Sequence, residues 1–316
     1  MKVLVTGAAG FVGSALCQAL LREGHYVVAV DSFFEGLYPQ SGRRRRFQQI
    51  LEEHGPMIMP LEIDVLELQP HHLDSIDAVA NLAAFPGLRE TWRQPEMVWR
   101  QNVATVQHLA RLAVDQDLPL VHASTSSVYG RVAKGVSSSL PNPVSPYGIS
   151  KLAAENILEM YGSSDGLRSV SLRLFSVYGP GQRSDMAFYK AIDSILSGKV
   201  FTVAGDGRQS RANTFVSDAA AAFVSALRAM HDKRPLPPAI DICGPEVHSL
   251  RQALEVIENL YGESINLRFE GVAKGDQLST QADTEAALKH LYFRPETSFR
   301  EGMEIQFRWM AEYKDA

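Results

Sequence analysis

The sequence predicts an α/β fold built on a doubly wound parallel sheet, with a smaller C-terminal lobe. Three observations lead to this prediction. Short apolar strands alternate with helices through the first half of the chain, which is typical of a parallel sheet covered on both faces. A glycine-rich loop at 7–13 directly follows the first strand. After Phe175 the alternation breaks, and turns rich in glycine and proline separate shorter strands.

Each element of the sheet is expected from its local pattern. Buried strands are short apolar or β-branched runs, and we expect them at 2–6, 26–31, 57–63, 78–83, 118–123 and 169–175. Helices with apolar residues at helical spacing are expected between these strands, notably at 11–22, 97–114 and 147–161.

The same patterns divide the chain into two units. A strand, an alanine-rich helix and a second strand at 215–242 are expected to return to the main sheet. The predicted sheet domain therefore comprises residues 1–175 plus about 215–242, and the predicted lobe comprises residues 176–214 plus 243–316.

Composition narrows the classes of protein. The chain has 316 residues, of which 45% are hydrophobic and 21% charged, as in an ordinary globular protein. A net charge of −5 argues against a general nucleic-acid binder. The sequence has neither a secretory leader pattern nor an apolar run of the roughly 20 residues that span a bilayer. We therefore expect a cytoplasmic protein without a membrane partner.

The cysteines and histidines show no metal-site pattern, and the basic run has a structural interpretation. Cys17 and Cys243 lack the spacing of metal ligands or redox pairs, and we expect two reduced core thiols. His71 and His72 are expected in a solvated loop. The basic run at 43–46 is interpreted as the solvated start of a helix in preference to a phosphate clamp.

The loop after the first strand has the pattern of a dinucleotide site. Gly7, Gly10 and Gly13 allow a tight turn, a close approach of backbone amides to a pyrophosphate, and close contact between helix and strand. The following helix then directs the positive end of its dipole at the phosphates. A glycine turn between ordinary core elements is the alternative, but the position at the first strand–helix junction favours the cofactor.

Two aspartates extend this site. Asp31 ends the second strand, where its carboxylate can bind an adenosine ribose and repel a 2′-phosphate, so NAD is favoured over NADP. Asp64 and Val65 end the third strand and are expected to meet the adenine. Each aspartate alone is also compatible with a helix cap.

Tyr147 and Lys151 lie one helical turn apart, after a run of hydroxyl residues at 124–127. A free tyrosine, with a pKa of about 10, is a poor base at neutral pH. A lysine at the i+4 position can stabilise the phenolate. In the order glycine loop, hydroxyl run and tyrosine–lysine pair, these signals predict a nicotinamide-cofactor enzyme with a tyrosine acid/base.

These motifs resemble the extended short-chain dehydrogenase/reductase family, and specifically its nucleotide-sugar epimerases, dehydratases and decarboxylases. The resemblance covers nearly the whole chain and includes Leu82-Ala83-Ala84, Asn102, the segment 177–180, and the segment 205–207 leading to Arg211. It implies a Rossmann domain with NAD as cofactor. The implied cofactor-binding residues are Gly7, Gly10, Phe11, Val12, Gly13, Asp31, Asp64, Val65, Leu82, Ala83, Ala84, Asn102, Tyr147 and Lys151.

The resemblance also implies the reaction. Thr125, Tyr147 and Lys151 would be catalytic, with Tyr147 deprotonating a sugar 4-hydroxyl and Thr125 bonded to the same oxygen. Dehydratases carry an Asp-Glu pair just after this threonine, and decarboxylases keep a glutamate there. Here Ser126 and Ser127 stand in those places and cannot serve as carboxylate acid/base groups. Oxidation, turning of the keto intermediate and hydride return remain, which amounts to epimerisation at C4.

Three stretches, 84–89, 125–130 and 182–188, look most like bacterial UDP-glucuronate 4-epimerases. The implied reaction converts UDP-glucuronate to UDP-galacturonate. A 4-keto uronate is a β-keto acid, which loses carbon dioxide when its carboxylate stands perpendicular to the carbonyl plane, and hydroxyl donors can prevent that alignment. The implied substrate-binding residues are Arg89, Thr125, Ser126, Ser127, Ser176, Arg183, Phe188 and Arg211.

Two departures keep alternatives open. Asn81 replaces the histidine common before Leu-Ala-Ala, and Ala212 and Asn213 replace the residues that usually follow the diphosphate arginine. Another NDP-hexose 4-epimerase, in which the serines merely make room for a neutral sugar, remains an alternative. So do a dehydratase, decarboxylase or reductase of this family and a non-catalytic dinucleotide sensor.

The expected assembly is a homodimer. The predicted helices at 97–114 and 147–161 are apolar around much of their circumference, and the family pairs these helices between subunits. Packing of both helices under loops is the alternative. The apolar residues in question are Trp99, Val103, Val106, Leu152, Ile157 and Leu158.

Overall fold

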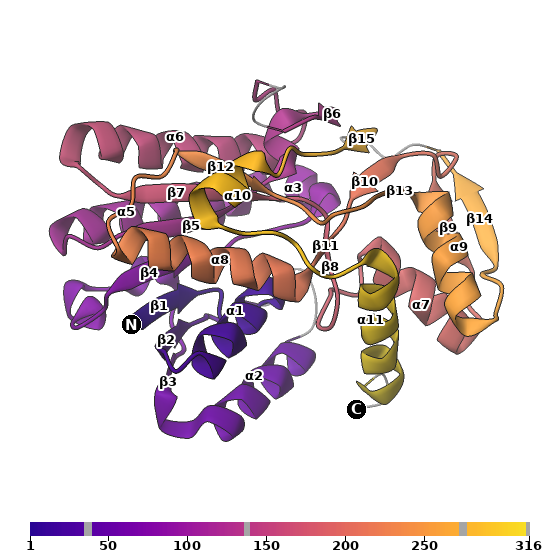
Figure 1. The fold of residues 1–316 in the computed structure, drawn as a ribbon, viewed down its shortest axis with the longest axis horizontal. Helices are drawn as coiled ribbons and strands as arrows, with labels where there is room; N and C mark the ends of the chain where they lie inside the picture. Colours follow the sequence, from indigo (N-terminus) through magenta and orange to yellow (C-terminus); the bar gives the residue numbers. More distant parts are fainter. Residues whose placement is uncertain (35–39, 136–139, 272–276, 314–316) are drawn as a thin grey trace.

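A seven-stranded sheet forms the centre of the larger unit (Figure 1). The computed structural model describes residues 1–34, 40–135, 140–271 and 277–313, with only the backbone of Leu88 and Arg89. The strand order is β12-β7-β5-β4-β1-β2-β3, and every neighbouring pair is parallel. These strands are β1 (Lys2–Thr6), β2 (Tyr26–Val30), β3 (Ile58–Leu61), β4 (Ala78–Asn81), β5 (Leu120–Thr125), β7 (Ser169–Leu174) and β12 (Ala239–Ile242).

The strand order reverses between β1 and β4. A crevice forms outside the carboxyl ends of the strands at such a switch point. The inner strands carry apolar residues on both faces, and Val3, Leu4 and Val5 are completely buried. The doubly wound parallel sheet predicted from the sequence is therefore confirmed.

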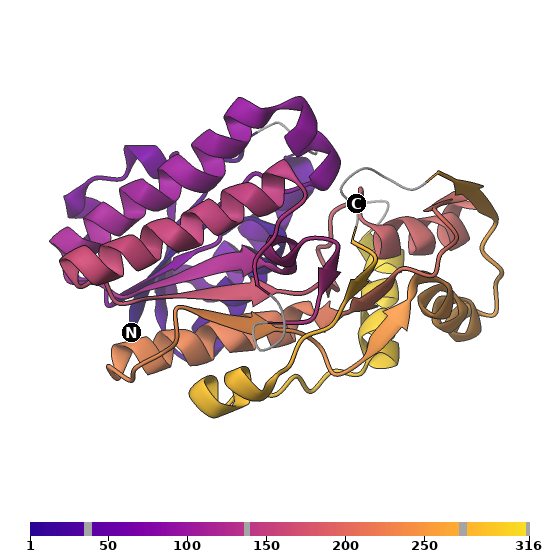
Figure 2. The ribbon, with the colours of Figure 1, turned by 90° about the horizontal axis from the view of Figure 1, so that it is seen from above.

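Two layers of helices cover the sheet (Figure 2). One face packs against α1 (Phe11–Arg22), α2 (Ser41–His54), α8 (Val216–His231) and α10 (Glu285–Leu291). The other face packs against α5 (Thr105–Asp115) and α6 (Pro146–Asp165), which lie side by side. Preceding α5 are α3 (Leu88–Arg93) and α4 (Pro95–Trp99).

The predicted helix at 97–114 is helical throughout, but its hydrogen bonding changes from α to π and back. A π-helical turn, Arg100–Ala104, separates α4 from α5. The side chain of Asn102 accepts from the Phe85 amide at 2.7 Å and donates to the Phe85 carbonyl at 3.2 Å. Such π-turns often accompany functional sites. Here the turn brings Asn102 to the loop that follows β4.

The lobe has an apolar core of its own. Its helices are α7 (Ala187–Ser197), α9 (Leu250–Tyr261) and α11 (Phe299–Tyr313). Beside them, β9 (Phe201–Ala204) and β14 (Leu267–Glu270) form a parallel pair. The aromatic rings of Tyr178, Phe188 and Phe299 meet in this core, with centroids 5.3–5.8 Å apart.

Short strands connect the lobe to the sheet domain. One small sheet has the order β13-β10-β15-β6, from β13 (Val247–Ser249), β10 (Ser210–Ala212), β15 (Ser279–Thr280) and β6 (Val132–Ala133). A second joins β8 (Val177–Tyr178) to β11 (Thr214–Phe215). Because β6 follows the hydroxyl run and β10 carries Arg211, the first sheet ties two predicted site segments together.

Two further sequence expectations concern the cysteines and the membrane. Both thiols are buried and free, and burial raises the pKa of Cys243 to about 12. Both are core thiols, as expected. Among the described residues, no helix has the length and apolarity needed to cross a bilayer.

Candidate active site

A cavity of about 430 Å³ lies at the carboxyl ends of the sheet strands. It runs from the glycine loop after β1, past the ends of β2 and β3, to the hydroxyl run after β5 and the first turn of α6. On the lobe side it is closed by residues that include Arg183, Arg211 and Gln277. The cavity therefore collects residues from Gly7 to Gln277, which lie far apart in the sequence.

The glycine loop has the shape of a phosphate cradle. Gly7 has a φ of +68°, and a Cβ there would stand 2.8 Å from the Ala83 amide nitrogen. A Cβ at Gly13 would stand 2.0 Å from the Gly7 carbonyl oxygen, so α1 can begin this close to β1 only with glycine. Backbone amides and the N-terminus of α1 thus face the cavity. The loop fits a dinucleotide pyrophosphate.

At one end of the cavity, the carboxylate of Asp31 is held by two backbone amides. Its carboxylate accepts from the Ala9 amide at 3.0 Å and the Phe33 amide at 2.8 Å. Burial raises the pKa of Asp31, while these amides and the nearby Arg43 act in the opposite direction. Asp64 accepts from the Leu66 amide and thereby also caps a short helical turn. Both carboxylates line the cavity.

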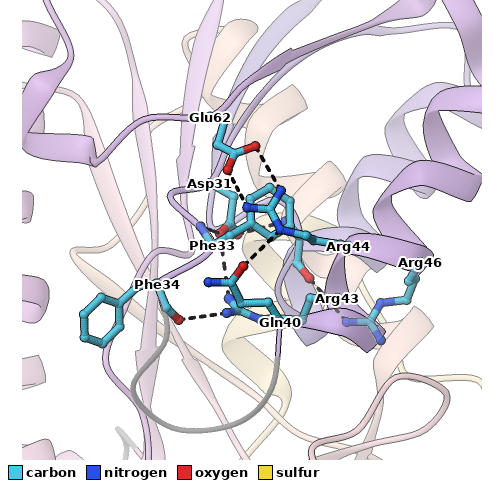
Figure 3. Close-up of polar contacts among 9 residues, drawn as sticks. Asp31, Phe33, Phe34, Gln40, Arg43, Arg44, Arg46 and Glu62 are labelled. Carbon is cyan, nitrogen blue, oxygen red and sulfur yellow. Dashed lines mark hydrogen bonds and ion pairs between the residues drawn. The ribbon is translucent and has the colours of Figure 1, made fainter.

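The basic run lies against this end of the cavity (Figure 3). Arg43 lines the cavity with its Nη1 3.8 Å from Asp31, and Arg46 donates to the Ala9 carbonyl at 3.3 Å. Arg44 stacks over the Phe33 ring at 4.0 Å and forms a forked ion pair with Glu62. The interpretation of a wholly solvated helix start is therefore wrong, because Arg43 and Arg46 point towards the cofactor loop.

At the other end, α6 presents the tyrosine and the lysine. Ser145 caps the helix by accepting from the Gly148 amide, and Pro146 occupies its first position. A Cβ on Gly148 would stand 2.5 Å from the Ser127 carbonyl oxygen, so glycine lets the helix approach the hydroxyl run. Tyr147 and Lys151 consequently line the same part of the cavity.

Burial controls both of these titratable groups. Burial raises the pKa of Tyr147, opposed by the charge of Arg183 and a hydrogen bond with Thr125. Burial lowers the pKa of Lys151 to about 8, opposed by Glu155. The lysine Nζ donates to the Ala123 carbonyl at 2.8 Å. Burial therefore dominates the pKa of Tyr147, and the opposing influences come from Arg183 and Thr125 and not from Lys151 as expected.

The hydroxyl run forms a compact 3₁₀ turn, Ser126–Tyr129, after the end of β5. The Thr125 hydroxyl accepts from the Ser127 amide at 3.1 Å and donates to the Ser127 hydroxyl at 3.3 Å. Ser176 faces the same cavity with a φ of +26°, a conformation that non-glycine residues rarely adopt and that is found at functional sites.

A buried polar chain supports this turn from behind. Glu155, one turn after Lys151 on α6, accepts from the Ser124 hydroxyl and pairs with Arg173 at 2.6 Å. Arg173 also donates to the Tyr129 hydroxyl at 2.7 Å, and that hydroxyl donates to Asp241 at 2.8 Å. This buried chain of hydrogen bonds connects α6, β7, the hydroxyl turn and β12.

Two predicted substrate cations line the cavity with their own partners. Arg183 forms a bidentate pair with Asp185, both bonds measuring 2.9 Å. Arg211 donates to the main-chain carbonyls of Ser210 at 2.9 Å and Gln277 at 2.5 Å. The side chain of Arg89 lies outside the described residues.

Two further predicted site residues, Phe188 and Asn102, do not line the cavity. Phe188 is packed into the lobe core between Tyr178 and Phe299, so the structure assigns it to that core and not to the substrate pocket. Asn102 does not line the cavity but fixes its wall through Phe85 and donates to the Ser150 hydroxyl at 3.0 Å.

The two sequence departures have local explanations. Asn81 is completely buried below the cavity, accepts from the Thr6 hydroxyl at 2.7 Å and is bonded to His122 Nδ1 at 3.0 Å. Ala212 is buried at the end of β10, and the side-chain amide of Asn213 donates to the Arg211 carbonyl. Neither departure lines the cavity, so the changed residues alter its support and not its surface.

Sequence reasoning missed several residues that line the cavity. The basic run at 43–46 is the sequence signal for Arg43, but its pattern favours a solvated helix start over a place in the cavity wall. Gln277 gave no signal, because no motif surrounds it and it lies far along the chain from the residues it contacts. The other missed lining residues are Val30, Ser32, Phe34, Ile63, Phe85, Pro86, Gly87, Gln101, Ala123, Ser124, Leu174, Val177 and Met186.

A glycine-cradled dinucleotide groove that ends at a threonine, a tyrosine and a lysine defines an enzyme of the nicotinamide-dependent class. The sequence profile of the NAD dependent epimerase/dehydratase family matches residues 3–242. The chain belongs to this family, and NAD is its cofactor.

Relatives and solved structures cover nearly the whole chain. The uncharacterized UDP-glucose epimerase YtcB of Bacillus subtilis (strain 168) is 34% identical, over 98% of both chains. The UDP-glucuronate 4-epimerase of Thermodesulfobacterium geofontis (strain OPF15) is 30% identical, over 98% of this chain and 96% of that one. A tyrosine-to-phenylalanine variant of UDP-glucuronic acid 4-epimerase from Bacillus cereus, in complex with UDP-4-deoxy-4-fluoro-glucuronic acid and NAD, superposes with a TM-score of 0.93, at 35% identity over 99% of both chains.

Proposed function

We propose that the protein is an NAD-dependent UDP-glucuronate 4-epimerase, which interconverts UDP-glucuronate and UDP-galacturonate through a 4-keto intermediate. The observation that carries this proposal is the chemistry of the cavity lining. Asp31 and Asp64 are the acidic residues among the described lining residues, and both lie where the adenosine is expected. At the sugar end the lining offers hydroxyls instead, from Thr125, Ser126 and Ser127.

Residues of α6 and the hydroxyl turn would carry the proton chemistry. Tyr147 takes the proton of the sugar 4-hydroxyl and later returns it, while Thr125 bonds the same oxygen. When bound, NAD accepts the hydride from C4 and returns it to the opposite face of the sugar. Lys151 is held by the Ala123 carbonyl beside the tyrosine, where its positive charge stabilises the phenolate.

Among the described residues, the sugar end of the cavity is lined by no carboxylate, which favours epimerisation over water loss. Dehydration of a 4-keto sugar needs a base at C5 and an acid at C6. Glu155 is the nearest acidic residue on α6, but it is buried outside the cavity lining and paired with Arg173. It is therefore a structural group in this arrangement.

The hydroxyls also suit an acid sugar. Ser126, Ser127 and Ser176 can donate hydrogen bonds to a carboxylate and keep it in the plane of the C4 carbonyl. In that plane the C5–carboxylate bond cannot overlap with the carbonyl π-system, so carbon dioxide is retained. Arg183 would contribute a cation beside Tyr147, and Arg211 would grip the diphosphate through charge-assisted bonds.

The second candidate is a UDP-glucose 4-epimerase, which the name of the Bacillus subtilis relative favours. Purified protein should be supplied with UDP-glucuronate and with UDP-glucose in parallel, and the products followed by NMR. Formation of UDP-galacturonate without net NADH production supports our proposal. Interconversion of UDP-glucose and UDP-galactose, without formation of UDP-galacturonate, would instead show that the substrate is the neutral sugar. A protein that binds NAD but turns over neither sugar would favour a dinucleotide sensor.

We further propose that the protein works as a cytoplasmic homodimer. Each subunit would comprise an NAD-binding domain, 1–175 plus about 215–242, and a nucleotide-sugar-binding lobe, 176–214 plus 243–316, with the difference that α10 of the second range packs against the sheet. Trp99, Ile149 and Met160 support the dimer, because they are 45–52% exposed on α4 and α6. Val106 and Leu158 are excluded from this face, since they are at most 2% exposed and pack in the core.

A further inference from the structure

Gln277 has contacts that connect three parts of the cavity. It is 8% exposed, lines the cavity, and stands just before β15. Its side-chain nitrogen donates to the carbonyls of Ser126 at 3.1 Å and Gly130 at 2.7 Å. Its main-chain carbonyl accepts from Arg211 at 2.5 Å. One residue of the lobe therefore touches both ends of the hydroxyl turn and the predicted diphosphate cation.

The orientation of this amide is determined by its partners. Both carbonyls are acceptors, so the two N–H groups of Gln277 must face them and its Oε1 must face the remaining partner. That partner is the Ser126 hydroxyl, at 3.5 Å. At this distance the serine proton is weakly held and can turn to a stronger acceptor such as a carboxylate.

The surrounding backbone makes the connection stiff. The Leu278 amide donates to the Arg131 carbonyl at 2.8 Å, and the Leu278 carbonyl accepts from the Ser210 amide at 3.0 Å. β15 pairs with β6 on one side and β10 on the other. The hydroxyl turn is thus connected to the Arg211 strand through the segment that begins at Gln277.

We propose that Gln277 is a positioning residue that fixes the hydroxyls of Ser126 and Ser127 relative to the diphosphate held by Arg211. This inference rests on the proposed epimerase function. When the amide is lost, the turn can shift and the sugar carboxylate can leave the carbonyl plane. The C5–carboxylate bond then breaks, its electron pair forms the C4–C5 enolate, carbon dioxide departs, and C5 takes a proton from water. The products are a 4-keto pentose nucleotide and retained NADH.

The test compares Gln277→Met, which keeps the side-chain length but has no N–H donor, with the wild type and with Ser279→Ala. The control removes a hydroxyl contact of 2.9 Å between Ser210 and Ser279 in the same small sheet, outside the cavity lining. For each protein, kcat, the fraction of decarboxylated product, NADH absorbance at 340 nm and the affinity for UDP alone are measured.

We expect Gln277→Met to lower kcat by about 10- to 100-fold and to raise the decarboxylated fraction and the NADH absorbance. UDP affinity should stay within about twofold of wild type, because the main-chain carbonyl that holds Arg211 remains. Unchanged kcat and product ratio would overturn the inference, as would a parallel loss of UDP affinity in Gln277→Met or the same defect in Ser279→Ala. A wild type that turns over only UDP-glucose would refute the glucuronate proposal, while the split between kcat and UDP affinity would still test Gln277.

Discussion

Tyr147 is half-buried in the cavity wall, and burial raises its pKa. A tyrosine in this state needs nearby positive charge and hydrogen-bond donors before it can act as a base. Arg183 and Thr125 already act in that direction. The cationic nicotinamide ring of bound NAD would lower the pKa of Tyr147 further. The strength of this residue as a base would then depend on whether the cofactor is bound.

We expect Tyr147→Phe to reduce turnover by at least about 10³-fold, since no other phenol among the described lining residues can replace it. Lys151→Met should reduce turnover by about 10²-fold at pH 7 and regain part of it at higher pH, where the tyrosine ionises without help. Steady-state kinetics from pH 6 to 10 measure both effects, and NAD binding by fluorescence serves as the folding control. Near wild-type turnover of Tyr147→Phe would remove it from the mechanism.

The pKa of Lys151 also predicts a pH dependence of stability. It is about 8 in the fold against an ordinary 10.5, so between these values the unfolded chain binds a proton that the folded chain does not. Stability attributable to Lys151 therefore rises with pH across this window, by about 3 kcal/mol in all.

Urea unfolding of wild type and Lys151→Met checks this sign. The difference in the free energy of unfolding, methionine variant minus wild type, should be greatest below pH 8 and should decline towards pH 10. Loss of the hydrogen bond to Ala123 offsets the two curves by a constant. Parallel curves across the window would show that the lysine keeps its ordinary pKa.

At the scale of elements, α6 carries two functions along one face. Tyr147, Lys151 and Glu155 follow each other at i+4 spacing, so they lie above one another on the helix. The first two face the cavity, and the third enters the buried chain with Arg173, with both side chains 8% exposed. The helix therefore joins the reacting groups rigidly to the strands beneath them.

Breaking this pair on one side should be costly. Glu155→Leu leaves the Arg173 guanidinium buried without its carboxylate, and we expect a loss of about 3–5 kcal/mol in the free energy of unfolding. The double variant Glu155→Leu/Arg173→Met should recover most of that loss, because no uncompensated charge remains. Urea denaturation of the two single variants and the double variant completes the cycle. Additive losses would mean that the two side chains are not coupled.

The elements also show what local sequence can predict. β1 and α1 have the bounds expected from the sequence, because an apolar strand, a glycine turn and an amphipathic helix are local signals. The π-turn before α5 depends on the contact of Asn102 with Phe85, which no local pattern encodes. Phe188 and Gln277 show the same limit in the site: whether each lines the cavity is decided by tertiary packing alone.

At the scale of the whole molecule, the exposed face of α4 and α6 is the predicted contact with a second copy. Introducing a charge into an apolar contact of this kind opposes association, because the charge loses its hydration. We expect a dimer at micromolar concentration and a monomer for Met160→Glu. Tyr313→Glu, on α11 in the lobe, should leave the dimer unchanged. Light scattering of the three proteins measures their oligomeric states. A monomeric wild type would contradict the proposed dimer.

The position of β12 in the sheet bears on how the chain is made in the cell. This strand lies at the edge beside β7, yet the ribosome synthesises the intervening lobe segment before it. Until β12 emerges, the outer edge of β7 has no strand partner, and Tyr129 lacks the Asp241 carboxylate that accepts its hydrogen bond. The seven-stranded sheet can therefore be completed only after residues 176–214 of the lobe have been synthesised.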